Sequence, residues 1–289
     1  MRVAPPLRMQ RHHFTVDVEE YFQVSALAGV VARATWGGRE SRLERSVDDL
    51  LELLGQAEAS GTFFVLGWVA EHHPSLVRRI AAAGHEIASH GWDHRLVTDQ
   101  EPEEFRRSVR RTRQELEQLT GTTVEGFRAP SYSIVPGHEW ALDVLIEEGY
   151  RYDSSLFPVW RPGGRYGYPA GRSDPHWVTR PAGRIAELPP ATLTVGRWRL
   201  PAGGGAYFRV LPSVLVEAAL DACAARGVPG TFYIHPWELD DGQPRLAVPL
   251  LTRLRHYTGL ARTRARLERL LRRFSFTPMR RTVEALCTG

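Results

Sequence analysis

The sequence contains no lysine, because all 37 of its basic residues are arginine. Without a lysine amine the chain cannot form a Schiff base with a carbonyl, anchor pyridoxal phosphate or supply the lysine of a Walker-type phosphate loop. It also has only two cysteines, Cys223 and Cys287, which lie far apart and show no metal-binding spacing. A disulfide framework is therefore not expected.

Long apolar runs are also missing. No stretch reaches the roughly 18 consecutive apolar residues that a membrane-spanning helix requires. The first residues, MRVAPPLRMQRHH, lack the apolar core of a secretory signal. We therefore expect a cytoplasmic protein without a transmembrane segment. Because 43% of the 289 residues are hydrophobic, the chain can bury a substantial core as one large α/β domain, alone or with an appendage.

Positive charge is concentrated near the C-terminus. Residues 245–281 contain eleven arginines and one acid, Glu268, although the net charge of the chain is only +4. Within this segment an apolar helical stripe consists of Leu260, Leu267, Leu270, Leu271 and Phe274. We expect 245–289 to be a basic helical extension that packs on the domain through its leucines, away from the candidate catalytic motifs. Peripheral contact with a membrane or polyanion is the alternative. Nucleic acid is not an expected partner, because no nucleic-acid-binding motif accompanies the charge.

Short apolar segments alternate with segments of helical periodicity. The predicted strands are 12–18, 61–67, 85–89, 124–130, 150–155 and 230–238, and the predicted helices are 46–59, 74–84, 98–121, 137–149 and 211–227. This alternation predicts a parallel sheet with right-handed crossovers, either open or closed into a barrel. Residues 158–210 are long and irregular for a connector, so we expect a functional loop region or an insertion there.

Ionisable side chains repeatedly follow the predicted strands. They are Asp17 and Glu19, His90 and His94, Arg128, Asp153 and His235. In parallel α/β folds, the carboxyl ends of the strands meet at one edge, where sites are assembled from several loops. Each position alone is weak evidence, but their shared placement predicts a site at this edge.

His90 and His94 have the His-x3-His spacing that can present two imidazoles to one metal ion. A carboxylate from Asp17 or Glu19 would complete a two-histidine, one-carboxylate set, which leaves positions open for water and substrate. These two acids are two residues apart at a strand end, so one can bind metal while the other accepts a proton from water. A zincin helix is excluded, because HEIAS has Ser89 where the second histidine should stand, and no G-x-S-x-G elbow is present.

Three further residues are candidates for supporting roles. His235 could protonate a leaving nitrogen, because imidazole titrates near neutral pH; the alternative is an ordinary core histidine. Arg128 could pair with Asp17 and keep it ionised, or form an ordinary ion pair. Asp153 could orient His235, or be an exposed acid at a strand end.

Six stretches carry a resemblance to a known family. They are TVDVEEYF (15–22), GTFFVLGWVAE (61–71), GHEIASHGWDH (84–94), FRAPSYS (127–133), YRYDSSLFP (150–158) and FYIHPWE (232–238). In this order they resemble the polysaccharide deacetylases of the NodB-homology type (carbohydrate esterase family 4), and more narrowly the branch associated with exopolysaccharide loci and exosortase systems. The resemblance covers residues 13–240 and implies a distorted (β/α) barrel with a divalent metal, commonly zinc.

The resemblance also implies roles for individual residues. His90 and His94 would bind the metal, Asp17 would be the general base, His235 the general acid, Arg128 the partner of Asp17, and Asp153 the support of the catalytic histidine. The family usually has two adjacent aspartates, of which the second is the ligand, but Val18 follows Asp17 here. A D-x-D form fits Asp17-Val18-Glu19 with Glu19 as the ligand, and the division of roles between the two acids stays open.

The expected reaction is removal of N-acetyl groups from N-acetylhexosamine residues of a polysaccharide or oligosaccharide, in exopolysaccharide biosynthesis. A backbone N–H near Tyr132 would stabilise the oxyanion. Trp92 and Trp237, each close to a proposed site residue, would contact the sugar. Two alternatives remain. One is hydrolysis of another non-peptide amide, such as a peptidoglycan sugar or a small cyclic amide, and the other is a catalytically inactive carbohydrate-binding barrel.

Overall fold

The strand β1 (His12–Val18) is buried along its whole length and lies between two parallel neighbours. On one side it pairs with β2 (Thr62–Val65), which is followed in the sheet by β3 (Glu86–Ser89). On the other side it pairs with β10 (Thr231–Ile234). All four strands are continuous apolar or β-branched runs with a few polar positions, as expected for strands that are covered on both faces.

The structure is a computed structural model that describes residues 11–161 and 166–288. Residues 1–10, where no signal region is expected, lie outside the described residues. The same holds for 162–165 within the 158–210 region and for residue 289 at the end of the 245–289 segment.

The sheet continues past β3 through β4 (Gly126–Phe127), β5 (Tyr152–Asp153) and β7 (Gly183–Glu187), all parallel, to the antiparallel edge strand β6 (His176–Arg180). Its order is β10-β1-β2-β3-β4-β5-β7-β6. Isolated bridges from Pro190 to Thr231 and from Gly204 to Tyr233 bring the chain after β7 back to β10. The result is a mixed α/β fold with a curled half-barrel sheet, which confirms the predicted class.

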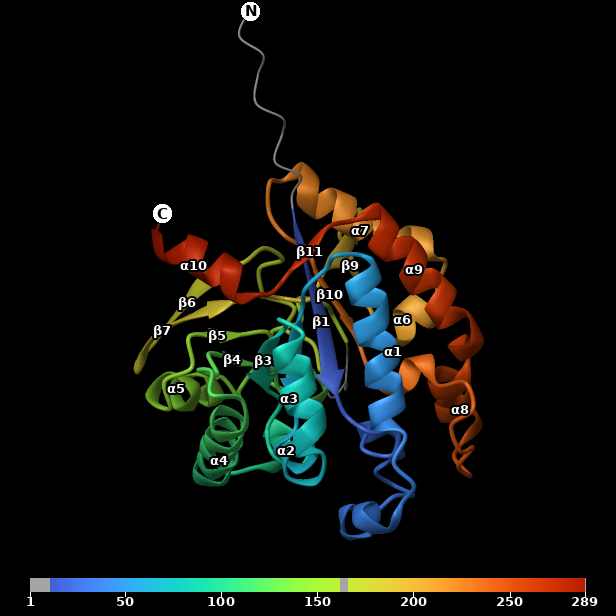
Figure 1. The fold of residues 1–289 in the computed structure, drawn as a ribbon. Coiled ribbons are helices and arrows are strands. Elements are labelled where there is room, and N and C mark those ends of the chain that lie inside the picture. Colours follow the sequence, from blue (N-terminus) through green and yellow to red (C-terminus); the bar gives the residue numbers. More distant parts are fainter. Residues whose placement is uncertain (1–10, 162–165, 289) are drawn as a thin grey trace, which may run out of the picture.

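Helices surround the curled sheet (Figure 1). They are α1 (Leu43–Gln56), α2 (Gly67–His72), α3 (Pro74–Ala82), α4 (Pro102–Thr120), α5 (Trp140–Glu147), α6 (Gly205–Val210), α7 (Ser213–Ala225), α8 (Leu250–Tyr257), α9 (Thr263–Arg273) and α10 (Arg280–Thr288). Within residues 11–161 and 166–288, none of the helices is long and apolar enough to cross a membrane.

The bounds of α4 follow from local chemistry. Pro102 occupies its first turn, and Glu101 and Glu104 form a reciprocal capping box with the backbone. Gly121 ends the helix in the left-handed region at φ 66°, where a residue without Cβ carries no steric cost. The buried face of the helix includes Phe105 and Val109.

The region 158–210 differs from its expected irregularity, because it contains β6, β7, α6 and a separate hairpin of β8 (Thr192–Val195) and β9 (Trp198–Pro201). The two hairpins turn at Gly183 (φ 137°) and Gly196 (φ 59°). These two glycines therefore mark tight hairpin turns.

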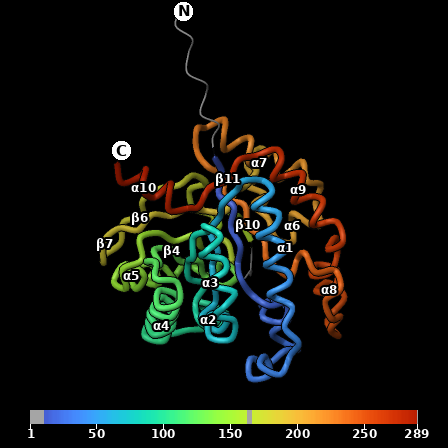
Figure 2. Tube along the Cα trace, viewed as in Figure 1, coloured from blue at the N-terminus to red at the C-terminus, as the bar shows by residue number. Residues whose placement is uncertain are grey.

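The segment 245–289 is helical, as expected, but it is not an appendage. Its strand β11 (Phe276–Thr277) pairs with β1. Arg264 of α9 lies 3.0 Å from Asp49 and 3.3 Å from Glu52 of α1, and Figures 1 and 2, drawn from the same side, show these two helices next to each other. Three of the clustered arginines, Arg264, Arg269 and Arg273, form ion pairs with acids elsewhere in the domain, which helps to hold this basic segment on it.

Candidate active site

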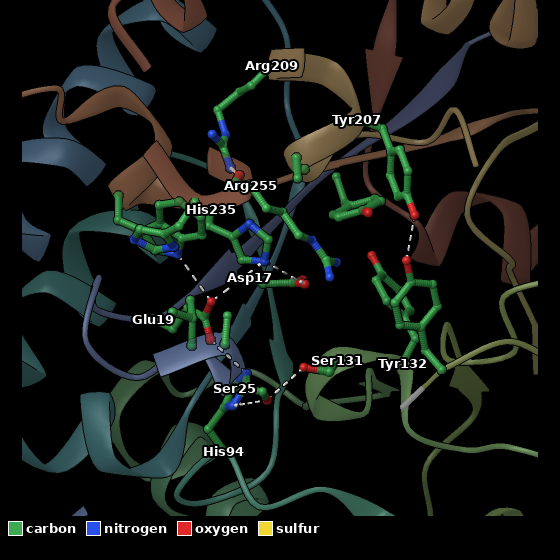
Figure 3. A pocket seen from close by; sticks show the side chains of 18 of the residues that line it. Asp17, Glu19, Ser25, His94, Ser131, Tyr132, Tyr207, Arg209, His235 and Arg255 are labelled. Carbon is green, nitrogen blue, oxygen red and sulfur yellow. Dashed lines mark hydrogen bonds and ion pairs between the residues drawn. The ribbon is translucent and has the colours of Figure 1, made fainter. Parts of the chain in front are cut away.

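The carboxyl ends of β1, β3 and β10 open into one pocket of about 680 Å³. The lining side chains that the sequence analysis singled out are Asp17, Glu19, His90, His94, Tyr132, His235 and Trp237. Figure 3 shows the labelled members of this set facing a common space. Residues more than 200 positions apart meet here because β10 pairs directly with β1.

Glu19, His90 and His94 form a compact donor set. One potential ligand atom from each lies within 4.8 Å of the others, and all three side chains are buried. Nδ1 of His90 is 2.8 Å from the carbonyl oxygen of Arg128, so it donates there and leaves Nε2 as the free acceptor. Burial lowers the pKa of His90 to about 4, which keeps the imidazole in the neutral form that binds metals.

The two oxygens of the Glu19 carboxylate have different surroundings. Oε1 accepts a hydrogen bond from the indole of Trp237 at 3.2 Å. Oε2 lies 2.7 Å from Nε2 of His94, yet it is buried without a properly oriented hydrogen-bond donor in the described part of the chain. Burial alone would raise the pKa of Glu19, but the charges of nearby histidines, His94 first, lower it to about 2. Two imidazole nitrogens and an ionised carboxylate suit a divalent cation, with zinc among the best fits.

Asp17 is held by Arg128 behind the pocket. Nη1 of Arg128 donates to Oδ1 of Asp17 at 2.7 Å and to Thr15 Oγ1 at 2.8 Å, while Nη2 donates to Ser154 Oγ at 2.9 Å. The Arg128 side chain is fully buried. A buried guanidinium with these partners fixes one oxygen of Asp17 and leaves Oδ2 facing the pocket.

His235 follows β10 and caps the 3-10 turn η5 (Pro236–Leu239). Its Nδ1 is 2.6 Å from Oε1 of Glu238, and its Nε2 lies 3.8 Å from Asp17 Oδ2 and 3.6 Å from Glu19 Oε1. Burial by itself would lower the pKa of His235, but the hydrogen bond to Glu238 and the charge of Glu19 raise it to about 9. His235 therefore carries a proton at neutral pH, next to Asp17.

Glu238 is in turn held by Arg209, whose Nε donates to its Oε2. Arg209 also donates to the carbonyl oxygens of Thr258 at 2.7 Å and Arg255 at 3.2 Å. The C-terminal segment thereby braces the site, which corrects the expectation that it lies away from the catalytic motifs. Arg255 itself lines the pocket.

Asp153 lies outside this cluster. It ends β5, which is five strands from β10 in the sheet order, and it accepts hydrogen bonds from the hydroxyl and amide of Ser155 at 2.6 and 3.1 Å. Burial raises its pKa to about 6, in a pair with Glu187 at the end of β7. In the described residues the group bonded to Nδ1 of His235 is Glu238, so the expected orienting role of Asp153 does not hold.

The two candidate tryptophans lie in different places, one in the pocket lining and one outside it. Trp237 lines the pocket and stacks on His235, with ring centroids 5.1 Å apart. Trp92 packs against the backbone of Gly67, where a Cβ atom would lie 2.2 Å from its ring, and carries the guanidinium of Arg111 at 3.3 Å from its centroid. It is absent from the lining of the pocket, so the expectation that Trp92 contacts the sugar is wrong in this geometry.

Tyr132 lines the pocket, but through its side chain. Its own amide donates to Ala129 O at 2.9 Å, and a backbone N–H near Tyr132 as oxyanion donor stays a prediction. Its phenol oxygen is buried without a hydrogen-bond partner in the described residues. Burial first of all raises the pKa of Tyr132 well above its usual value, so the phenol keeps its proton and can donate it.

Several pocket residues have unusual backbone geometry. Among the described non-glycine residues, positive φ occurs at Glu58 and at three pocket residues, His94, Ser131 and Tyr132. Such conformations cost free energy and gather where the backbone is constrained for function. The hydroxyls of Ser131 and Ser25 bond to each other at 2.8 Å, and Ser25 reaches Nδ1 of His94 at 3.4 Å. Sequence reasoning missed both serines.

It also missed Glu238 and Arg209. Glu238 had a usable signal, because an acid three residues after His235 and just beyond Pro236 can form a capping box. Arg209 had none, since 29 residues separate it from Glu238.

Two family models match the chain in adjacent stretches. Residues 39–151 match the model for polysaccharide deacetylase. Residues 154–284 match a domain of unknown function, DUF3473. The first stretch contains His90, His94 and Arg128, and the second contains His235 and Glu238.

Curated relatives match over short stretches. The chain is 33% identical over 95 residues to a peptidoglycan-N-acetylglucosamine deacetylase of Bacillus cereus, which is 32% of this chain and 34% of that relative. It is 40% identical over 63 residues to a chitooligosaccharide deacetylase of Rhizobium leguminosarum, 22% of this chain and 29% of that relative. The matched part thus spans about a third or less of these relatives. Family model and relatives together support the polysaccharide deacetylase family, whose members hydrolyse carbon–nitrogen bonds.

Solved structures agree in fold. A protein from Mycobacterium smegmatis assigned as a polysaccharide deacetylase has a TM-score of 0.66 and 22% identity, and the match covers 99% of this chain and 93% of that one. The allantoinase PuuE has a TM-score of 0.61 and 18% identity, with 96% of this chain and 91% of that one covered. At such identities the likeness concerns the fold alone.

Proposed function

We propose that this protein is a metal-dependent hydrolase that removes N-acetyl groups from N-acetylhexosamine residues of a polysaccharide, in exopolysaccharide biosynthesis. The observation that carries the proposal is the arrangement of three groups around one pocket. They are the donor set Glu19, His90 and His94, the carboxylate Asp17 and the protonated His235. The polysaccharide deacetylase match over residues 39–151 supports the same chemistry.

Glu19, His90 and His94 are the proposed holders of a divalent cation, with zinc as the proposed metal. The approach of Glu19 Oε2 to Nε2 of His94 and the fixed tautomer of His90 support this assignment. When bound, such a cation supplies Lewis-acid chemistry, lowering the pKa of a water molecule and polarising a carbonyl. Glu19 rather than Asp17 is the proposed carboxylate ligand, because it belongs to the compact donor set.

Asp17 is the proposed general base. Arg128 holds its Oδ1 at 2.7 Å, which fixes the carboxylate and leaves Oδ2 to accept the proton of the attacking water. The base is thereby pointed at the same space that the metal-binding set faces.

His235 is the proposed general acid. Its Nε2 lies 3.8 Å from Asp17 Oδ2, so base and acid flank one reacting centre. A pKa of about 9 keeps His235 protonated at neutral pH and ready to protonate the departing sugar amine. Glu238 and Arg209 orient the ring and compensate its charge, which makes them positioning residues.

Substrate contacts come from two aromatic side chains. Trp237 stacks on both His235 and His256, so it would meet the substrate with its edge, and Tyr132 presents a phenol hydroxyl that lacks a partner among the described residues. A buried donor without an acceptor costs free energy, and a sugar or acetyl oxygen would supply one. We infer that Tyr132 donates a hydrogen bond to the substrate.

The testing experiment is acetate release from a panel of N-acetylated glycans, with protein loaded with zinc and with chelator-treated protein. The panel includes chitooligosaccharides, peptidoglycan fragments and acetylated exopolysaccharide. Metal-dependent acetate release from at least one glycan is expected. Failure on every glycan with metal bound would reject the proposal and favour another amide as substrate.

A further inference from the structure

One wall of the pocket has no role in the proposed reaction. It consists of Arg161, Tyr166, Tyr207 and Arg255, which we call the cationic wall. All four residues lie within 154–284, the part of the chain that matches the domain of unknown function. Figure 3 shows Arg255 and Tyr207 reaching into the pocket opposite Glu19 and His94. The wall therefore faces whatever part of the substrate extends away from the donor set.

The cationic wall presents hydrogen-bond donors. Nη1 of Arg161 donates to the phenol oxygens of Tyr166 and, at 3.2 Å, of Tyr207. The two phenols also bond to each other at 2.6 Å. One hydroxyl proton is used in that bond, so the other remains to be donated to a ligand. Arg255 adds a guanidinium group, which is rich in donors and has no acceptor.

The charge of Arg255 is not balanced by an acid. Across residues 11–161 and 166–288, its guanidinium group has no ion pair or hydrogen bond within the protein. The two acids that line the pocket already have partners, because Asp17 pairs with Arg128 and Glu19 lies 2.7 Å from Nε2 of His94. Burial raises the pKa of the Tyr166 phenol, and the positive charge of Arg255 acts in the opposite direction.

Arg255 contrasts with several other arginines of the same basic segment. Arg264 pairs with acids of α1, and Arg273 pairs with Glu217 and Asp221 of α7. Those arginines hold the segment on the domain. Arg255 instead is an exposed residue that lines the pocket, so its unpaired charge faces the space in which an anion would bind.

We propose that the pocket binds a sugar carrying an anionic group, either a carboxylate or a phosphate, and that Arg255 is the main contact of this group. The hydrogen-bond donors of the cationic wall and the unbalanced charge of Arg255 support the proposal. This inference rests on the proposed function for the acetamido end of the substrate. Planar guanidinium groups match the geometry of both anions, and the free phenol proton can donate to a further oxygen of either one. The substrate class is then an acidic N-acetylated glycan.

The test is calorimetric binding of three sugars to the zinc-loaded protein. They are N-acetylglucosamine, its 6-phosphate and the corresponding 6-carboxylate. The charged sugar that matches the natural substituent is expected to bind about tenfold more tightly than the neutral one, the gain from one charge-assisted hydrogen bond. This preference should weaken as salt is raised. The two charged probes distinguish a phosphate from a carboxylate.

Two variants make the test specific. Arg255→Gln is expected to lose about tenfold affinity for the preferred charged sugar and far less for the neutral one. Arg253→Gln removes the same charge from the same exposed helix but lies outside the pocket lining, so it should bind like the parent. Equal losses for neutral and charged sugars, or equal losses in both variants, would overturn the proposal.

Binding also separates this inference from the proposed reaction. Arg255-dependent binding of a charged sugar without any acetate release would keep the anion site and reject deacetylation. Acetate release with no preference for charged sugars would keep the reaction and reject the anion site. Unfolding curves of both variants show whether either substitution has changed the fold.

Discussion

Glu238 accepts a hydrogen bond from Nδ1 of His235 at 2.6 Å, three residues along the same short turn. Because a local turn creates this contact, the imidazole and its orienting acid move together. Arg209, from α6, then holds the acid from the other side. The proposed proton donor is thereby positioned by residues of its own loop and of the C-terminal half.

Glu238→Gln should lower kcat and shift the alkaline limb of the pH profile. In the parent, His235 has a pKa of about 9, so activity that needs its proton is present below that pH and falls as the pH rises through it. Without the Glu238 carboxylate, burial lowers the pKa of His235, so activity should fall at a lower pH than in the parent. We expect a loss of about tenfold at neutral pH, less than the about 100-fold loss expected when the proton donor itself is removed.

The pH dependence of acetate release checks this prediction. Glu217→Gln is the matched control, because Glu217 is also a buried carboxylate paired with arginine but lies outside the pocket. An unchanged alkaline limb in Glu238→Gln would show that Glu238 does not set the protonation of His235.

Asp17→Asn should reduce turnover by about 100-fold or more, because the amide cannot accept the proton of the attacking water. Metal content should stay the same, since Asp17 is not in the donor set of Glu19, His90 and His94. Acetate release and elemental analysis of the purified variant measure the two effects separately. Retained turnover would remove Asp17 from the base role.

His94→Ala should lower both metal content and activity, because it removes one of three proposed ligands. Added zinc should raise the Tm of the parent and not that of the variant, since only a folded protein with an intact site gains binding free energy. His72→Ala is the control, because His72 is an exposed histidine that stacks on Trp68. Equal zinc stabilisation of parent and His94→Ala would contradict the ligand assignment.

Trp92→Leu should lower the free energy of unfolding by about 1–3 kcal/mol, the usual range for lost packing. The KM for a glycan should stay unchanged, because Trp92 packs on Gly67 and Arg111 outside the pocket. Trp237→Leu should instead impair turnover, since Trp237 stacks on His235 and donates to Glu19. Urea unfolding and steady-state kinetics distinguish the two. A raised KM in Trp92→Leu would return this residue to the substrate site.

The buried pair of Asp153 and Glu187 should make the fold less stable as pH rises. Burial raises the pKa of Asp153 to about 6 and that of Glu187 well above its usual value. Between the unfolded and folded pKa values the folded state binds more protons, so the free energy of unfolding decreases with increasing pH. Glu187→Gln should flatten this dependence in urea titrations between pH 5 and pH 8, whereas the exposed Glu103→Gln should leave it unchanged. An equally steep dependence in Glu187→Gln would contradict the assignment.

The sequence alone predicted the sheet class and seven of the residues that line the pocket. The strand β1 was predicted with its observed bounds, because a buried run ahead of charged residues is a local pattern. His90 and His94 were paired by spacing, and Asp17 and His235 by their common position at strand ends. These inferences work because side chains at the carboxyl ends of parallel strands share one edge whatever the length of the connections.

Other features depended on which strands and loops become neighbours. Asp153 follows its strand as His235 does, but the order of strands in the sheet sets β5 apart from β10, whereas Glu238 reaches His235 through their shared local turn. Trp92 and Trp237 were equally close to site residues along the chain, and packing turned one of them against Gly67.

The cationic wall belongs entirely to tertiary structure, since Arg161 and Arg255 are nearly a hundred residues apart. Local sequence determines which residues are buried in a strand or helix and which follow its end, because those properties depend on nearby residues. Long-range packing alone decides which distant charges are neutralised and which, like that of Arg255, are left facing a cavity.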